Sequence, residues 1–215
     1  EWYDVGADMA GAVSLLGALS DQILGGRHQI RTYRELFRQS LGLDPMDEPL
    51  GALFAHAMKI DSQLATSISE DRDGLLELLF SRLIQPTLGA ERPLIVTHYP
   101  LTQAALAKQA VDDPQCAARF EWFSGGVELA NGYDELLDAD ELLRRYHQNN
   151  DRRAASGRTP LTIETSLVQA MRQGLPECAG VALGVDRLLM SRMKSQSIRD
   201  VIPCRLTWRN TGRSN

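Results

Sequence analysis

The chain has 215 residues and a formal net charge of -5, with 43% hydrophobic and 24% charged residues. This composition is ordinary for one globular domain with a sizeable core. The acidic balance disfavours a surface built mainly to hold nucleic acid, because phosphate binding relies on clustered Lys and Arg. No apolar run reaches the roughly 18 residues of a membrane span, and no signal-peptide pattern is present. We therefore expect a soluble, cytoplasmic, single-domain protein without a membrane partner.

The first part of the chain, residues 8–90, is predicted to be mostly helical. Apolar residues recur at helical spacing from Met9 to Leu24, where Gly25-Gly26 can cap the helix. Thr32 and Glu35 have capping-box spacing, which predicts the start of a second helix. Further helices are expected over Leu50–Ile60 and Asp71–Leu83.

Residues 91–215 are predicted to supply most of a sheet. Leu94–His98 is a short apolar run before Pro100, as in a buried strand. Gly125-Gly126 is a favoured two-residue hairpin turn between two strand-like runs. Helices are expected over Ala139–Ser156 and Thr165–Gly174. The cysteines have no metal-ligand spacing and are read as reduced thiols, and the C-terminal arginines as a solvated end (Cys116, Cys178, Cys204; Arg205, Arg209, Arg213).

The hairpin brings acidic side chains together. With Gly125-Gly126 as the turn, Phe123 lies opposite Glu128, so Glu121 and Glu128 project from one face. Diagonal neighbours on adjacent strands sit roughly 7 Å apart, close enough for two carboxylates to reach one hard divalent cation. Mg²⁺ is the natural candidate.

A third carboxylate, Glu135, follows Glu128 by seven residues, and this odd offset would place it on the opposite face of an unbroken strand. We expect a bulge at Asn131-Gly132 to restore the facing, because a glycine within a strand often marks one. The three glutamates would then line one acidic floor. Alternatively, they form only the solvated face of an antiparallel hairpin, and the pattern by itself favours this plainer interpretation.

A second pattern, Gly180–Met190, has small residues that run into a helix, with Arg187 at the junction. Glycines let a flat ligand approach the backbone, and a guanidinium can stack on a base or reach a phosphate. A nucleotide fits both features, although close strand–helix packing would explain the glycines equally well. The spacing matches neither a Walker loop nor a Rossmann fingerprint.

Taken together, three blocks in order resemble the end of the catalytic domain of class II lysyl-tRNA synthetases. They are Glu1–Tyr3, similar to the end of motif 2, Phe120–Leu136, and Gly180–Leu188, similar to motif 3. The resemblance runs over almost the whole chain and implies an α+β fold, a mainly antiparallel sheet flanked by helices. It also implies that residues 1–215 are the C-terminal portion of one such domain. Motif 1, most of motif 2 and the N-terminal part would then be missing, and the full-length protein would be a homodimer.

Within that family, the stretches Glu70–Phe80, Gln103–Ala107, Arg152–Gly157 and Pro176–Gly184 are more similar to the stand-alone branch. Members of this branch attach lysine, preferably (R)-β-lysine, to a lysine of elongation factor P. Where tRNA-charging members usually have glycine in the amino-acid pocket, this chain has Ala182.

The resemblance implies a role for each matching residue. Glu121 and Glu128 would hold the Mg²⁺ that bridges the phosphates of ATP, with Arg187 and Glu128 as the catalytic side chains. Glu128, Leu129, Gly184 and Arg187 would contact ATP. Five further residues would bind the amino acid: Glu1, Tyr3, Asn131, Glu135 and Ala182. Of these, Glu135 and Tyr3 would contact its side-chain ammonium group.

The implied activity is ATP-dependent activation of lysine or (R)-β-lysine as an aminoacyl-adenylate, followed by transfer to elongation factor P. Two alternatives stay open: a fragment of a lysyl-tRNA synthetase that charges tRNA, and a truncated paralogue without catalytic activity. Positioning and metal charge carry most of such phosphoryl chemistry, so no covalent nucleophile is expected.

Overall fold

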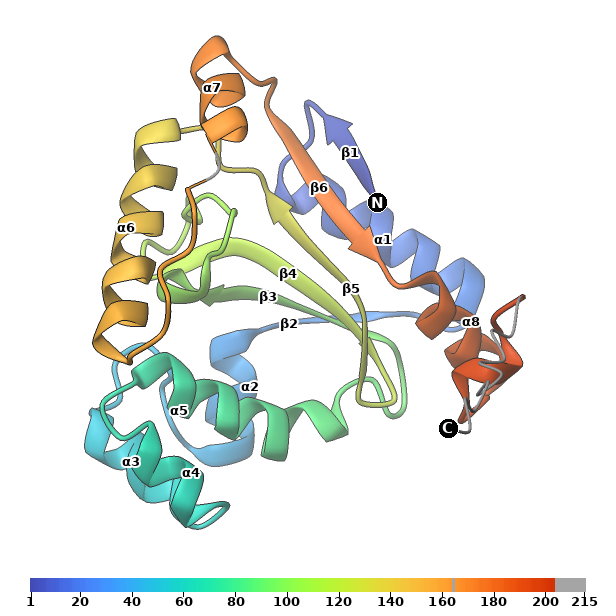
Figure 1. Ribbon diagram of the computed structural model, residues 1–215. Coiled ribbons are helices and arrows are strands. Elements are labelled where there is room, and N and C mark those ends of the chain that lie inside the picture. Colours follow the sequence, from blue (N-terminus) through green and yellow to red (C-terminus); the bar gives the residue numbers. More distant parts are fainter. Residues whose placement is uncertain (164, 204–215) are drawn as a thin grey trace, which may run out of the picture.

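A six-stranded mixed sheet organises the fold of the computed structural model, which describes residues 1–163 and 165–203 (Figure 1). The sheet order is β1-β6-β5-β4-β3-β2. The strands are β1 (Trp2–Val5), β2 (Gln29–Thr32), β3 (Leu94–Pro100), β4 (Cys116–Ser124), β5 (Val127–Asp134) and β6 (Cys178–Leu183). Within the described ranges, only β2 and β3 pair in parallel. The expected α+β class with a mainly antiparallel sheet is confirmed.

The helices precede, interrupt and follow the strands. They are α1 (Met9–Leu24), α2 (Tyr33–Leu41), α3 (Leu50–Ala57), α4 (Ser62–Ser67), α5 (Arg72–Leu79), α6 (Ala139–Ala155), α7 (Thr165–Gln173) and α8 (Val185–Met193). A π-helical segment and three 3-10 segments complete the set (Phe80–Ile84; Gln85–Thr87, Leu101–Gln103, Ile198–Asp200). No helix in these ranges has the length and apolar character to span a membrane.

Most helix ends follow their sequence signals. Helix α1 has the predicted bounds, and Gly25 follows it with φ 76°. At α2, Thr32 Oγ1 accepts from the Glu35 amide, while the Glu35 carboxylate accepts from the Thr32 amide, which confirms the capping box. Helix α3 ends at Ala57 rather than at the expected Ile60, because the Ile60 amide bonds back to the Ala57 carbonyl and tightens the chain into turns.

The strand at Leu94 is longer than predicted. It runs through Pro100, which takes the last paired position opposite Cys116. The register shifts between Thr97 and Tyr99, and the intervening His98 has φ 57°. This bulge lets the strand continue where sequence alone placed its end.

The two faces of the sheet are covered differently. On one face Leu16 of α1 and Leu188 of α8 join a cluster with buried strand residues such as Phe120 and Trp122. On the other face, helices α2, α3 and α5 cluster with residues of β3 and with Phe123 of β4. Figure 1 shows α2 to α5 gathered at one side of the sheet. Beyond them, the same face of β5, β6 and β1 carries half-buried and exposed side chains.

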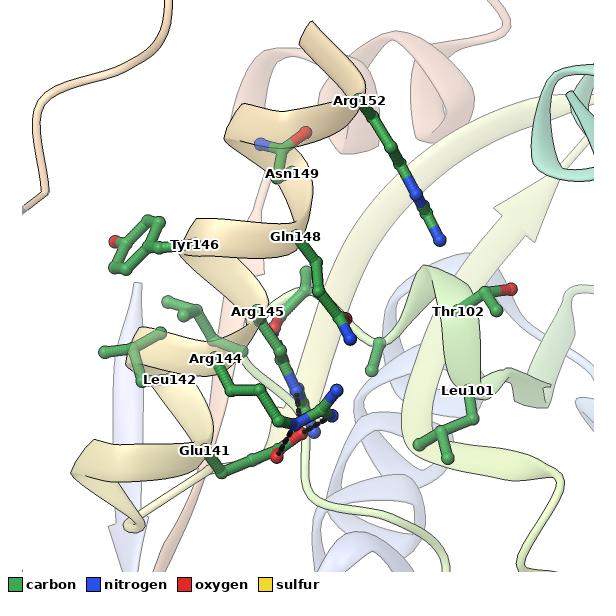
Figure 2. A pocket seen from close by; sticks show the side chains of 13 residues that line it. Leu101, Thr102, Glu141, Leu142, Arg144, Arg145, Tyr146, Gln148, Asn149 and Arg152 are labelled. Carbon is green, nitrogen blue, oxygen red and sulfur yellow. Dashed lines mark hydrogen bonds and ion pairs between the residues drawn. The ribbon is translucent and has the colours of Figure 1, made fainter. Parts of the chain in front are cut away.

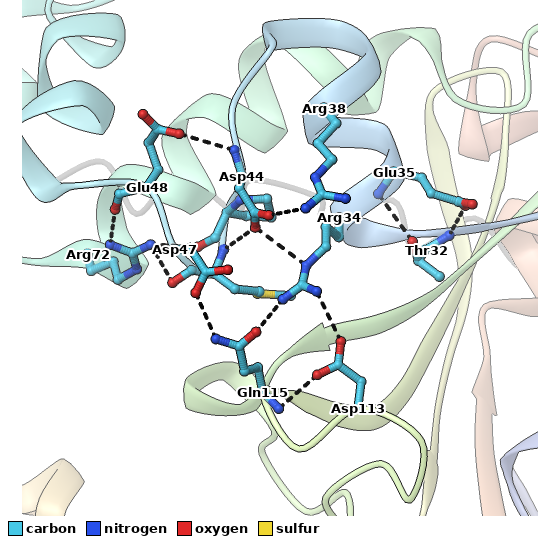
Figure 3. Close-up of polar contacts among 12 residues, drawn as sticks. Thr32, Arg34, Glu35, Arg38, Asp44, Asp47, Glu48, Arg72, Asp113 and Gln115 are labelled. Carbon is cyan, nitrogen blue, oxygen red and sulfur yellow. Dashed lines mark hydrogen bonds and ion pairs between the residues drawn. The ribbon is translucent and has the colours of Figure 1, made fainter.

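Polar contacts fix α2 to the loops beside it (Figure 3). Arg34 donates to Gln115 and lies 3.3 Å from the Asp113 carboxylate and 3.4 Å from that of Asp44. Arg72, at the start of α5, donates to three backbone carbonyls of residues 45–48. These bonds tie the helical segment to the loop between β3 and β4.

The hairpin forms as predicted, but its bulge lies elsewhere. Phe123 pairs with Glu128 and Trp122 with Ala130, so the extra residue is Leu129 rather than Asn131-Gly132. Leu129 and Ala130 are both buried toward α1 and α8. As expected, a bulge returns the later residues of β5 to the same face of the sheet as Glu128. It lies two positions before the predicted one.

Gly132 has a different reason to be glycine. A Cβ atom there would overlap the Phe120 ring and lie 2.8 Å from the Gly180 carbonyl oxygen. Close packing, rather than a bulge, excludes a side chain at this position.

The described cysteines, Cys116 and Cys178, are free and buried, in agreement with reduced thiols. Cys204 and the three arginines of the C-terminal tail lie outside the described residues.

Candidate active site

The uncovered part of the sheet carries the predicted site on one face. Glu121 pairs with Asn131, Asn131 with Ala182, and Tyr3 with Gly180, so the side chains at these positions project to the same side. The bulge at Leu129 brings Glu128 to that side as well. β1, β4, β5 and β6 therefore assemble residues from opposite ends of the described chain, such as Tyr3 and Ala182.

Glu121 is the most constrained carboxylate of this face. It is 8% exposed, accepts a 2.6 Å hydrogen bond from the Tyr99 hydroxyl, and forms an ion pair with Arg119 through its other oxygen. Arg119 lies 4.7 Å above the Tyr99 ring. Burial disfavours the charged guanidinium, but the Glu121 carboxylate outweighs this and raises the pKa of Arg119. The guanidinium therefore stays charged although it is partly buried.

Glu128 is half-buried, and its carboxylate lies 3.8 Å from the Arg187 guanidinium. Burial, followed by the negative charge of Glu121, raises the pKa of Glu128. A bound cation between the two carboxylates would offset both effects. Two carboxylate donors fit Mg²⁺, which takes one or two carboxylates together with phosphate oxygens and water.

Glu135 does not join Glu121 and Glu128 at one point, although it shares their face. Within the described residues, no group of three or more acidic, histidine or cysteine side chains is arranged to hold a metal ion. The acidic floor thus divides into a pair, Glu121 with Glu128, and a separate carboxylate at Glu135.

Glu135 and Tyr3 lie over Gly180. A Cβ atom at Gly180 would overlap the Glu135 carboxylate and lie 2.8 Å from the Tyr3 ring, so glycine leaves just enough room for both side chains. Burial, and next the negative charge of Glu1, raises the pKa of Glu135 to about 7. Tyr3 donates a 2.9 Å hydrogen bond to Glu1, which, with burial, raises the pKa of Tyr3 to about 12. The two raised pKa values reflect burial and neighbouring negative charge, which a bound cation would offset.

Asn131 lies on the same face, between Arg119 and Tyr133. Its side-chain oxygen accepts from Arg119 at 3.3 Å, and its amide nitrogen donates to the Tyr133 hydroxyl at 2.7 Å. Ala182, which pairs with Asn131 on the neighbouring strand, is exposed.

The predicted nucleotide residues meet at the junction of β6 and α8. Arg187, in the first turn of α8, donates to the Glu128 carbonyl at 3.0 Å and runs its methylenes past Gly184. The Gly184 amide donates to the Leu129 carbonyl at 2.8 Å. The Leu129 side chain is buried on the opposite face, so its backbone alone adjoins this corner.

Sequence reasoning missed Arg119, Tyr99 and Glu77. Arg119 precedes Glu121 by two residues on one strand, and this spacing predicts a shared face. Tyr99 lies across β3 beyond its bulge, and Glu77 lies on α5; neither position could be related to Glu121 without the fold. Burial, followed by the charge of Glu121, raises the pKa of Glu77, which indicates that α5 adds negative potential to the site.

A groove of about 570 Å³ lies between α6 and the segment around Leu101–Leu106 (Figure 2). Arg144 and Arg145 both bind Glu141 there. Arg145 also donates to the carbonyls of Ala105 and Ala107, and Ala107 bridges to Glu135. None of the groove residues belongs to the predicted site; Arg145 braces the backbone beside Glu135.

Curated proteins with a common name resemble this chain over most of its length. The chain is 40% identical, over 203 residues, to a protein of Sodalis glossinidius (strain morsitans) named elongation factor P--(R)-beta-lysine ligase. It is 39% identical to proteins of the same name from Yersinia pestis (strain Pestoides F) and Yersinia pseudotuberculosis serotype O:1b (strain IP 31758). Each match covers 94% of this chain and 62% of the relative, so the chain spans less than two thirds of their length.

The family comparison covers most of the sheet and the helices around it. Residues 32–204 match the model for the tRNA synthetases class II (D, K and N). This range contains β3 to β6 and α8, and therefore Glu121, Glu128, Asn131, Glu135 and Arg187. The match spans more than half of the chain. The chain belongs to the class II tRNA synthetase family of the D, K and N type.

Proposed function

We propose that the protein containing this chain activates lysine or (R)-β-lysine with ATP and transfers the acyl group to a lysine of elongation factor P. The observation that carries the proposal is the corner over Gly180, where the absence of a side chain leaves room for the Glu135 carboxylate and the Tyr3 ring to lie together. A half-buried carboxylate with a raised pKa gains most from a partner ammonium group. The names of the relatives support the acceptor.

The first step is in-line attack of the amino-acid carboxylate on the α-phosphate of ATP, which gives an aminoacyl-adenylate and pyrophosphate. Glu135 and Tyr3 would hold the side-chain ammonium, with Glu1 oriented by its bond from Tyr3. Asn131 would contact the polar end of the substrate, and Ala182 would limit the pocket beside it. Fixing the substrate in this way lowers the entropic cost of the attack.

At the other end of the face, Glu121 and Glu128 would hold Mg²⁺, which when bound neutralises phosphate charge. Arg187 adds a permanent positive charge at the α8 terminus, where it can lie against the base and reach a phosphate. Gly184 and the Leu129 backbone would border the nucleotide. We also propose that residues 1–215 are the C-terminal portion of one class II catalytic domain and that the complete protein is a homodimer.

In the second step, an amine of the acceptor protein attacks the adenylate carbonyl, AMP leaves, and the amine proton passes to solvent. The acceptor separates the proposed activity from that of a tRNA-charging enzyme. We expect radiolabelled lysine or (R)-β-lysine to be transferred to elongation factor P by the complete gene product. Transfer to tRNA(Lys) alone would contradict the proposed acceptor. Adenylate formation without any transfer would contradict transfer to elongation factor P and to tRNA(Lys) alike.

A further inference from the structure

Arg119, a partly buried arginine, contacts one residue of the proposed metal site and one of the proposed amino-acid site. Its three nitrogens bond in three directions: Nη2 to the Glu121 carboxylate, Nε to the Asn131 side-chain oxygen at 3.3 Å, and Nη1 to the Gln103 carbonyl at 2.8 Å. Its side chain is 20% exposed. A permanent positive charge would repel the Mg²⁺ ion and the substrate ammonium group that the proposed site binds, so Arg119 must have another role.

The contacts explain what Arg119 does to Glu121. Tyr99 holds one carboxylate oxygen and Arg119 the other, so the carboxylate plane is fixed before any ligand arrives. The anchored carboxylate still has lone pairs that can bind a metal ion, and its orientation is fixed before the ion binds. Such partners orient ligands in metal sites, and their loss typically costs 10- to 100-fold in affinity or activity.

The same guanidinium sets the orientation of Asn131. Because Arg119 can only donate, it must face the amide oxygen, which turns the amide nitrogen to the Tyr133 hydroxyl 2.7 Å away. A chain of bonds therefore runs from Tyr99 through Glu121, Arg119 and Asn131 to Tyr133. It spans β3, β4 and β5 and contains Glu121 of the proposed metal site and Asn131 of the proposed amino-acid site.

We propose that Arg119 is a positioning residue that holds the metal-side carboxylate Glu121 and the amino-acid-side amide Asn131 in one fixed arrangement. This inference rests on the proposed function. It assigns Arg119 no contact with substrate. Gln103 anchors the guanidinium from the loop side, which makes the arrangement independent of ligand.

Arg119→Lys tests the proposal because it keeps the charge and loses the three-way geometry. In the complete gene product, we expect the half-saturating Mg²⁺ concentration and the KM for lysine each to rise about 10-fold or more. Calorimetric titration with Mg²⁺ and α,β-methylene-ATP should show the same loss in Mg²⁺-dependent binding, without turnover. The matched control is Arg34→Lys, because Arg34 has a similar side-chain exposure of 22% and carboxylate and amide partners that lie outside the site. It should lower the melting temperature and leave both dependences unchanged.

Two smaller changes keep the test valid if Arg119→Lys does not fold. Tyr99→Phe removes only the bond to Glu121 and should raise the Mg²⁺ requirement alone; Tyr133→Phe removes only the hydroxyl beside Asn131 and should raise the KM for lysine alone. Unchanged Mg²⁺ and lysine dependences in folded Arg119→Lys, or in both phenylalanine variants, would overturn the proposal. Absence of lysine-dependent activity in the unmodified protein would instead overturn the proposed function, and Mg²⁺-dependent nucleotide binding would still test Arg119.

Discussion

In the proposed amino-acid pocket, Glu135 would combine recognition of an ammonium group with sensitivity to pH. It lies against Tyr3 over Gly180, and burial with the nearby Glu1 raises its pKa to about 7. At neutral pH the unliganded side chain is therefore divided between its neutral and charged forms. A bound ammonium group favours the charged form, so binding and deprotonation are coupled.

The first prediction is that lysine affinity increases between pH 6 and pH 8 and that binding near pH 7 releases a proton. Below the folded pKa of about 7, a proton must leave Glu135 before the ammonium group can pair with it. Calorimetry in buffers with different ionisation enthalpies measures both effects. Glu135→Gln should bind lysine weakly and with little dependence on pH in this range; an unchanged pH profile in that variant would assign the effect to another group.

The raised pKa of Glu135 also affects stability. Because the folded protein holds the proton more tightly than the unfolded chain, this residue makes folding less favourable as pH rises from 4.5 to about 7. Above that range the penalty is constant. The free energy of unfolding of Glu135→Gln should accordingly exceed that of the unmodified protein at pH 8 by more than at pH 4.

A substitution at Gly180 should affect the proposed pocket without affecting folding. A methyl group at this position meets the ends of the Glu135 and Tyr3 side chains, which can move, rather than backbone. The second prediction is that Gly180→Ala lowers kcat/KM for lysine at least about 10-fold while the melting temperature changes little. Retention of full lysine activity in this variant would show that the amino acid lies elsewhere.

At the scale of elements, Gly132 differs from Gly180 because its neighbours cannot move. Its neighbours are the Phe120 ring and the Gly180 carbonyl oxygen at 2.8 Å, and both are fixed within the sheet. The third prediction is that Gly132→Ala destabilises the fold by about 1–3 kcal/mol, as overpacking of a core does. Denaturant unfolding compared with Gly180→Ala checks this, and equal stability of the two variants would contradict it.

The hairpin shows how far local sequence signals reach. Gly125-Gly126 predicted the turn and the Phe123–Glu128 pairing, because positive φ angles at a two-residue turn are a local requirement. The bulge was misplaced because Leu129 resembles any apolar strand residue. Its position depends on packing against α1 and α8, which are distant in sequence.

At the scale of the whole molecule, helix ends and the long strands could be predicted, but the edges of the sheet could not. β1 and β2 are four residues each and join the sheet at opposite edges. Tyr3, near the N-terminus, pairs with Gly180, which is far from it in the sequence. Expectations for individual site residues came from the family resemblance, whereas contacts such as that of Tyr99 with Glu121 required the fold.

The incomplete helical cover of one sheet face gives these residues a common surface. Helices α2, α3 and α5 cover β3 and part of β4, and the site begins where that cover ends. Glu128 and Arg187 lie toward α8, and Glu135 and Tyr3 lie toward β1. This separation matches a substrate activated at one end and recognised at the other.

Amino-acid-dependent exchange of pyrophosphate into ATP tests the central claim most directly. The complete gene product should catalyse exchange with lysine or (R)-β-lysine, and exchange with norleucine, which lacks the ammonium group, should be about 10⁴-fold slower. A site built to pair a charged group rejects an analogue without it, because its own carboxylate is left unpaired. Exchange at similar rates with lysine and norleucine, or none with either lysine isomer, would contradict the account.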